Sequence, residues 1–256
     1  MSSSTGGKEF YDKVAKKFGG YAYGTNDPKY SSVYQNGVPE EIFKSRLLEL
    51  SSDKRVALDV GCGDGKFAFS VADHFNKIVG LDSSAELLKV ANQKLKELNI
   101  TSVSFILGDA EKTPFEDSSF DIIFNRRGPS FYQEYFRLLN TDGYYLEIGI
   151  GEKDAVELKK NFERGQDYGN WNKSRLEKDK YELEKIGFKI ILIKDFYYSE
   201  YYLAQKDLDA FLQGVPIFED YDTGKDKDLL ERYSQEHESD KGIELKRHRL
   251  VIVAQK

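Results

Sequence analysis

One stretch decides the fold: Val56-Ala57-Leu58-Asp59-Val60-Gly61-Cys62-Gly63-Asp64-Gly65-Lys66. An apolar run typical of a buried strand leads into a glycine-rich turn, and the turn opens a helix. Backbone can therefore approach a ligand here, where side chains would block it. A dinucleotide-binding turn has the spacing G-x-G-x-x-G. The third glycine, Gly65, comes one residue too early for that spacing, so a nicotinamide-dependent oxidoreductase is disfavoured.

Downstream of this stretch, short apolar runs alternate with helical patterns, which is typical of a parallel sheet joined by crossover helices. The apolar runs are nearly continuous, as in Ile122-Ile123-Phe124, and this indicates that helices cover both faces of the sheet. The predicted strands are 56–60, 78–82, 103–107, 120–125 and 144–150, and the predicted helices are 66–75, 85–98 and 130–139. The sequence therefore predicts an α/β fold with a doubly wound sheet.

In the second half of the chain the pattern changes. Two charged helical stretches, 152–164 and 173–186, come first, and Gly187 ends the second. Two more apolar strands, 188–193 and 249–254, have no βαβ signature between them and are expected to pair antiparallel at the sheet edge. The prediction is a mostly parallel, seven-stranded sheet with an antiparallel C-terminal strand.

Three segments are expected to lie outside the sheet. Residues 1–8 are rich in Ser and Gly and are predicted to be disordered, which leaves 9–256 as a single domain. Residues 9–45 are predicted to form an N-terminal lid, and 196–243 an insertion between the last two strands. The charged part of the insertion, 219–241, is assigned no role, and its acidic start is expected to be a solvated surface.

The composition disfavours several classes of protein. The 256 residues include 38 Lys+Arg and 44 Asp+Glu, a net charge of −6, so no broad basic field for nucleic acid is expected. One Cys cannot form an internal disulfide, and together with three His it offers no cluster at zinc-ligand spacing. No apolar run approaches the roughly 20 residues of a membrane span, and the N-terminus does not resemble a signal peptide. A cytoplasmic protein without a metal is expected.

Two acids stand where successive strands end: Asp82 after the second strand and Asp109 after the third. Open α/β sheets bind ligands outside the carboxyl ends of their strands. A carboxylate in the first position can accept both hydroxyls of a ribose, and one in the second can accept an exocyclic amine such as that of adenine. Because the glycine turn itself contains no Lys or Arg for a phosphate, the two acids favour an adenosyl ligand without a pyrophosphate.

The order of these motifs resembles the class I S-adenosylmethionine-dependent methyltransferases over most of residues 8–150. The matching segments, in chain order, are 58–65, 79–84, 108–110, 114–115 and 119–123. The resemblance implies a Rossmann-like methyltransferase fold, S-adenosylmethionine as cofactor and methyl transfer as the activity.

The resemblance also implies a set of cofactor-binding residues. These are Tyr11, Asp59, Gly61, Gly63, Asp82, Ser83, Asp109, Ala110 and Asn125. The glycines would pass under the methionine part, Asp82 would bind the ribose, and Asn125 would lie beside the methyl group. Tyr11 would contact the cofactor from a lid helix. From the residues alone, Asp59 is equally suited to holding the glycine turn through backbone amides.

Arg126 and Arg127 follow the fourth parallel strand, and their guanidinium groups could hold a carboxylate or phosphate of the acceptor. Pairing with acids of the lid is the alternative. Methyltransferases of DNA adenine or protein glutamine carry Asn/Asp-Pro-Pro-aromatic at this point. Here the chain reads Asn125-Arg126-Arg127-Gly128-Pro129, which argues against those substrates. No catalytic base is assigned, because none of the three His lies beside a motif.

Three functions remain open. A small-molecule methyltransferase ranks first, because the chain is acidic, the size of one domain and without an appended nucleic-acid-binding module. An RNA methyltransferase would need Arg126, Arg127 and the lysines of 153–180 to form a basic approach surface. A non-catalytic protein would bind S-adenosylmethionine without turnover. The sequence predicts no oligomeric state.

Overall fold

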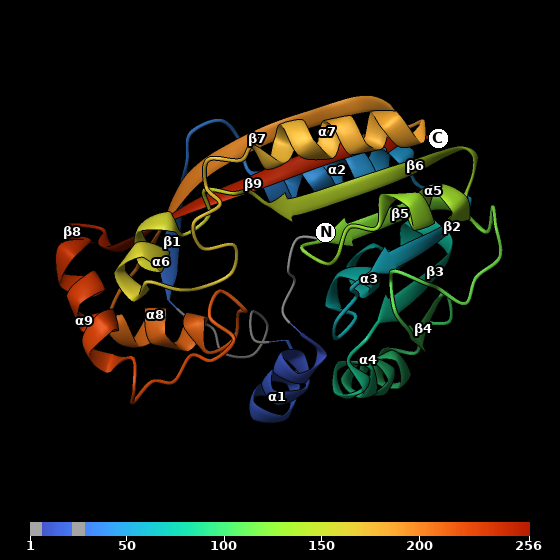
Figure 1. Ribbon diagram of the computed structural model, residues 1–256. Coiled ribbons are helices and arrows are strands. Elements are labelled where there is room, and N and C mark those ends of the chain that lie inside the picture. The colour runs from blue at the N-terminus through green and yellow to red at the C-terminus, as the bar shows by residue number, and fades with distance from the viewer. Residues whose placement is uncertain (1–6, 22–28) are drawn as a thin grey trace.

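The computed structural model describes residues 7–21 and 29–256. One open sheet runs through the molecule in the order β1-β7-β9-β6-β5-β2-β3-β4, and β8 pairs with β9 (Figure 1). The strands are β1 (Tyr30–Tyr34), β2 (Ser52–Val60), β3 (Phe75–Asp82), β4 (Val103–Leu107), β5 (Phe120–Arg126), β6 (Leu139–Ile150), β7 (Lys189–Tyr202), β8 (Glu238–Ser239) and β9 (Gly242–Gln255). Strands β2 to β6 pair in parallel, whereas β9 runs antiparallel to both β6 and β7.

All seven predicted strands are present, which confirms the doubly wound α/β fold and the antiparallel pairing of the last two strands. Two short strands, β1 and β8, extend the sheet. The sequence of β1 is Tyr-Ser-Ser-Val-Tyr, which is too short and too polar to stand out as a strand. It forms because a long neighbour, β7, offers an edge with which it pairs antiparallel over all five residues.

Helices cover both faces of the sheet, as the continuous apolar strands require. The helices are α1 (Lys8–Phe18), α2 (Pro39–Leu50), α3 (Lys66–Val71), the 3₁₀ turn η2 (Ala72–His74), α4 (Ala85–Leu98), α5 (Tyr132–Leu138), α6 (Val156–Phe162), α7 (Arg175–Ile186), α8 (Gln205–Leu212) and α9 (Lys227–Glu236). Helices α2 and α3 pack on one face through fully buried side chains such as Leu47 and Ala68. Helices α5 and α7 pack on the other through Tyr135 and Leu183.

The predicted insertion 196–243 is too long, because its aromatic start belongs to a strand. Phe196 to Tyr202 continue β7, and Gly242 already belongs to β9. From Phe196 onward every second side chain of β7 is buried, which is the period of a strand with one face on a core. The two long strands therefore extend well past the rest of the sheet, as Figure 1 shows.

A third core forms around the far ends of these strands. We call the far lobe residues 152–171 and 203–241 together with the ends of β7 and β9 on which they pack; it contains α6, α8 and α9 (Figure 1). The acidic start of the charged stretch is not a purely solvated surface as expected, because Asp226 is buried and binds Arg164, with 2.8 Å between Oδ2 and Nη2. Helix α9 then buries Leu230 and Tyr233.

The N-terminal helix α1 begins at Lys8, inside the segment predicted to be disordered; residues 1–6 of that segment lie outside the described residues. Asp12 accepts a hydrogen bond of 2.6 Å from the hydroxyl of Ser84, which caps α4. On the other side, Lys17 donates to Gln213, which follows α8, at 2.5 Å. Helix α1 therefore connects the parallel half of the molecule with the far lobe. Part of the predicted lid, 22–28, lies outside the described residues.

Among the described helices, none combines the length and the apolar character needed to cross a membrane.

Candidate cofactor and acceptor site

A cavity of about 890 Å³ opens at the carboxyl ends of the parallel strands. Its two ends differ in chemistry. The glycine end is lined by Tyr11, Asp59, Gly61, Gly63, Asp82, Ser83, Asp109 and Ala110. The tyrosine end is lined by Tyr30, Ser32, Tyr34, Glu40, Tyr198 and Glu200, while Arg126 and Arg127 also line the cavity. Ten of the eleven site residues predicted from the sequence thus line one cavity.

The glycine turn has the backbone that its sequence predicts. Gly61, Gly63 and Gly65 have φ angles of 69°, 56° and 74°, in the left-handed region that favours glycine. A Cβ on Gly63 would meet nothing within 4 Å, so this residue presents bare backbone to the cavity. At Gly65 a Cβ would lie 2.5 Å from the ring of Phe105. Packing, as well as the φ angle, therefore requires a glycine at this position.

Asp82 connects the turn to the end of β3. One carboxylate oxygen accepts the N–H of Gly63 and the other the N–H of Ser84, both at 2.8 Å. A carboxylate has about four acceptor positions, so Asp82 keeps acceptor capacity for a hydroxyl of a ligand in the cavity. Burial nevertheless raises the pKa of Asp82, and the backbone hydrogen bonds oppose this rise.

Asp109 and Ala110 follow β4 on the same side of the cavity. The Asp109 carboxylate accepts the N–H of Glu111 at 2.9 Å, which fixes its side chain at the edge of the site. Tyr11 reaches the cavity from α1, and burial raises the pKa of its hydroxyl well above the ordinary value. The adenosine-binding acids and the lid tyrosine predicted from the sequence are therefore brought together.

Asp59 and Arg126 are the unusual charges of the site. The Oδ2 atom of Asp59 is buried without a hydrogen-bond partner, and burial raises the pKa of this carboxyl to about 8. The Arg126 guanidinium lies 4.1 Å from the ring centroid of Phe67. Burial and the neighbouring Arg127 lower the pKa of Arg126 to about 10, while Asp59 opposes this shift. The alternative for Asp59 was a structural role in holding the glycine turn. Its Oδ2 atom does not have that role, because it accepts no hydrogen bond from the turn.

Asn125 is the predicted site residue that does not line the cavity. It is fully buried, and its amide closes the loop that follows β5 by accepting the N–H of Gly128 at 2.7 Å and donating to the carbonyl of Pro129 at 2.5 Å. An amide has both a donor and an acceptor, which is why Asn suits this turn. Asn125 therefore shapes the loop that carries the two arginines, and its contact with the transferable methyl group stays a prediction.

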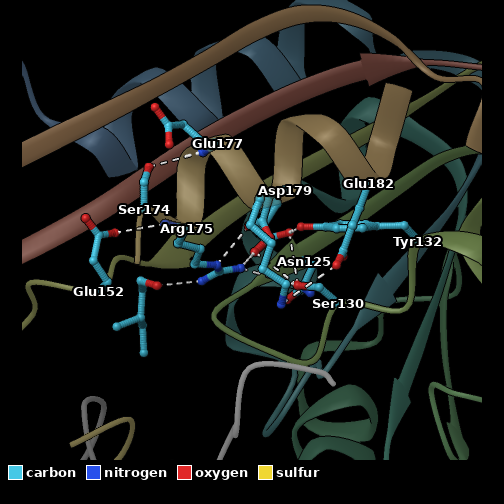
Figure 2. A network of polar contacts seen from close by, with 12 residues as sticks. Asn125, Ser130, Tyr132, Glu152, Ser174, Arg175, Glu177, Asp179 and Glu182 are labelled. Carbon is cyan, nitrogen blue, oxygen red and sulfur yellow. Dashed lines mark hydrogen bonds and ion pairs between the residues drawn. The ribbon is translucent and has the colours of Figure 1, made fainter. Parts of the chain in front are cut away.

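A buried network of polar side chains links the same loop to β6 and α7 (Figure 2). The carboxylate of Glu147 on β6 accepts hydrogen bonds from Ser130 at 3.1 and 3.2 Å and from Tyr145 at 2.7 Å. Arg175 at the start of α7 forms an ion pair with Glu147 and another, of 2.9 Å, with Asp179. Sequence reasoning missed this network, although an acid inside the apolar strand 144–150 is a signal for it.

The aromatic segments 11–34 and 196–202 were expected to cover the pocket, and tyrosines of both line its tyrosine end, whereas the acids Glu40 and Glu200 were missed. Tyr34 on β1 stacks on Tyr198 of β7 with 4.8 Å between ring centroids. Glu40, near the start of α2, pairs through Oε1 with Arg127 at 3.2 Å, and its Oε2 is buried without a hydrogen-bond partner. The acid Glu200 within an alternating aromatic run was an available signal, but an acid in the first turn of a helix is too common to have indicated Glu40.

The residues present fit S-adenosylmethionine. Bare backbone at Gly63, free acceptor positions on Asp82 and the acid Asp109 suit the adenosyl part. The unpaired Oδ2 of Asp59 suits a positively charged group, such as the ammonium of the methionine part.

Together, the strand order, the glycine turn and the two strand-end acids define a class I S-adenosylmethionine-dependent methyltransferase. Residues 51–213 match a family model described as a methyltransferase domain, and the chain belongs to that family.

Similar proteins agree with this membership. The chain is 29% identical over 139 residues to the uncharacterized methyltransferase YcgJ of Bacillus subtilis, covering 48% of this chain and 54% of that protein. The crystal structure of YcgJ matches with a TM-score of 0.61 at 19% identity, covering 84% of this chain and 98% of that one. A demethylmenaquinone methyltransferase of Lactococcus lactis is 32% identical over 116 residues, covering 41% of this chain and 46% of that protein. The chain thus matches about half the length of these two sequence relatives.

Proposed function

We propose that this chain is an S-adenosylmethionine-dependent methyltransferase whose acceptor is a small molecule. The observation that carries the proposal is the single cavity of about 890 Å³ in which the glycine end continues into the tyrosine end. Its volume is in the range of small-molecule pockets, and its second end combines three tyrosine rings with the polar side chains of Ser32, Glu40 and Glu200.

In this proposal the glycine end holds the cofactor, which supplies a methyl group on an already activated sulfonium. Asp82 and Asp109 bind the adenosyl part, together with the backbone of Gly63, Ser83 and Ala110. Such a displacement mainly requires alignment of donor and acceptor and exclusion of water. Helix α1 serves the second purpose, because it places Tyr11 over the cavity and connects to both halves of the molecule.

The tyrosine end holds the acceptor. Tyr34 and Tyr198 offer a stacked aromatic wall, and the unpaired oxygen of Glu40 accepts a hydrogen bond from an O–H or N–H of the acceptor. When that oxygen or nitrogen forms its bond to the methyl carbon, the carbon–sulfur bond breaks with its electron pair left on sulfur. Glu40 then accepts the proton that the acceptor loses.

Two observations favour a small acceptor over RNA. Arg126 and Arg127 line the cavity, where one lies over Phe67 and the other pairs with Glu40, instead of forming an outer basic surface. Lys159 of the lysine-rich segment is buried. The name of the demethylmenaquinone methyltransferase, one of the relatives, also denotes a small acceptor.

Transfer of labelled methyl groups tests the proposal. The purified chain is incubated with S-adenosylmethionine labelled in the methyl group and, separately, with a small-molecule extract, total RNA and unfolded protein. We expect label in the small-molecule fraction. Gly63→Val, which places a branched side chain at a φ of 56°, is the matched inactive control. Label in RNA or protein contradicts the proposed acceptor, and binding of the cofactor without any transfer supports the non-catalytic reading.

A further inference from the structure

The tyrosine end of the cavity is built on one face of the paired strands β1 and β7. Alternate residues of a strand share a face. The register places three residues of β1 across from three of β7: Tyr30 from Tyr202, Ser32 from Glu200 and Tyr34 from Tyr198. All of these except Tyr202 line the cavity. Glu200 is the charged member of this set and lies at its centre, with tyrosines before and after it on β7 and diagonally across from it on β1.

The carboxylate of Glu200 is satisfied at one oxygen. Its Oε2 accepts hydrogen bonds from the hydroxyl of Tyr202 at 2.9 Å and from Arg247 at 2.5 Å, whereas Oε1 accepts none in the described part of the chain. Glu200 is buried and lines the cavity. Arg247 is also buried but is not among the described residues that line the cavity, so the acid, and not the guanidinium, faces a ligand. A buried acceptor without a donor is the arrangement expected where a ligand supplies one.

A second carboxylate reaches the same end. Glu40 binds Arg127 through Oε1, and its Oε2 is buried without a partner. Burial raises the pKa of Tyr34, and the charges of Glu40 and Glu200 raise it further, because both acids lie near its hydroxyl group. The tyrosine end therefore offers a ligand acceptor atoms from two acids and the faces of aromatic rings.

An alkylammonium group has the complementary chemistry. It donates up to three hydrogen bonds, and its charge is attracted to the faces of aromatic rings. We propose that the acceptor carries a cationic amine and that Glu200, framed by Tyr30, Tyr34 and Tyr198, binds this group. The inference rests on the proposed function and names the class of its small acceptor. Glu200 then determines specificity, whereas the acceptor atom that receives the methyl group faces Glu40.

Fractionation of the small-molecule extract tests the class of acceptor. The extract is separated on a cation exchanger at acidic pH, where amines are charged and carboxylates are neutral. Each fraction is neutralised and incubated with the chain and with S-adenosylmethionine labelled in the methyl group. The retained fraction should contain the acceptor. If the acceptor is in the fraction that flows through, the inference fails while the proposed function stands. If label reaches no small molecule in either fraction, the proposed function fails as well.

Calorimetric titration of the complex with S-adenosylhomocysteine measures recognition without turnover. The probes are phenethylamine, phenethyl alcohol and phenylacetate, which share a ring and differ in charge. The wild-type chain should bind the amine at least about tenfold more tightly than the alcohol, as expected for one charged hydrogen bond. Tighter binding of phenylacetate would overturn the inference, because the arginines of the cavity would then select an anionic acceptor. Equal binding of the three probes, or binding of none, would overturn it too.

Variants assign the preference to named side chains. Glu200→Gln keeps an oxygen for Arg247, should bind the amine and the alcohol within about threefold of each other, and should bind S-adenosylhomocysteine as the wild type does. Tyr34→Leu should weaken binding of the amine by about fivefold, and Tyr34→Phe should retain it, because a phenyl ring keeps the cation–π contact. The matched control is Glu244→Gln, which should keep the full preference. Glu244 pairs with Tyr201, next to Glu200, and is not among the described residues that line the cavity.

Thermal unfolding shows whether each variant is folded. If a folded Glu200→Gln weakens all three probes equally, or keeps the full preference for the amine, the acid only supports its protein partners and the inference fails. If Glu200→Gln does not fold, the preference of the wild-type chain and the two variants of Tyr34 decide the question, and an unchanged preference in Tyr34→Leu overturns the inference.

Discussion

Two buried carboxylates, Asp154 of the far lobe and Asp59 of the cofactor half, differ in whether the protein pairs them. In the far lobe, Asp154 accepts hydrogen bonds from Arg247 at 2.9 Å and from Arg249 at 2.6 Å, and Arg247 also binds Glu200 at 2.5 Å. In the cofactor half, the Oδ2 atom of Asp59 has no such partner. The comparison teaches that charge paired within the protein holds the fold together, whereas charge left unpaired at a cavity serves a ligand.

The largest effect should come from breaking the paired side. Asp154→Asn leaves two buried arginines without their shared carboxylate, and the free energy of unfolding should fall by about 3–5 kcal/mol. The two arginines hold the pKa of Asp154 well below its usual range, so this carboxyl stays ionised in the folded protein. Urea unfolding followed by the fluorescence of Trp171, the only tryptophan, measures the change in the far lobe.

The matched control is Asp142→Asn, an exposed acid near the start of β6 with a φ of 63°, a conformation that Asn tolerates. It should change the free energy of unfolding by less than about 0.5 kcal/mol. If Asp154→Asn is equally mild, the buried pairs of the far lobe do not stabilise it, and the contrast between the two regions disappears.

A smaller effect, on ligand binding, is expected on the unpaired side. Asp82→Ala should weaken the binding of S-adenosylhomocysteine by about 1–3 kcal/mol, because the ribose hydroxyls lose a charged acceptor and the glycine turn loses an anchor. Calorimetry measures the affinity, with Asp73→Ala on the exposed 3₁₀ turn as the control. Unchanged affinity would restrict Asp82 to its structural bonds with Gly63 and Ser84.

An effect of similar size is a dependence on pH through Asp59. Its pKa is about 8 in the folded protein and about 3.9 in an unfolded chain, so the folded state binds more protons between these values. The free energy of unfolding should therefore fall as the pH rises through this window, and less so in Asp59→Asn. Because the ammonium of the ligand favours ionised Asp59, the affinity for S-adenosylhomocysteine should rise between about pH 6 and 8, approaching tenfold per pH unit. A flat profile in the wild type would show that Asp59 does not bind the ammonium.

The two regions also differ in how far their sequence predicts their structure. The parallel half follows local rules: an apolar strand, a turn whose φ angles need Gly61 and Gly63, then a helix. Each step involves residues close together in the chain, so the sequence predicted this half and the glycine end of the cavity. Asn125 shows where local rules stop, because nothing in the surrounding sequence indicated that its side chain holds the loop that follows β5.

The far lobe and the tyrosine end depend on partners distant in sequence. β1 exists only because β7 provides an edge for it, and Tyr34 meets Tyr198 through that pairing. Helix α9 looks like a solvated acidic stretch until Leu230 and Tyr233 meet the ends of β7 and β9. No local pattern contains such long-range contacts, which is why the aromatic end of β7 was assigned to the insertion and not to the strand.

Calorimetric titration of the wild-type chain with S-adenosylhomocysteine and, separately, with NAD tests the central claim most directly. The claim is that the glycine turn, Asp82 and Asp109 form a site for an adenosyl amino acid. The account predicts saturable binding of S-adenosylhomocysteine with one site per chain, and binding of NAD at least about a hundredfold weaker, because the turn lacks the dinucleotide spacing. Tighter binding of NAD than of S-adenosylhomocysteine would contradict it.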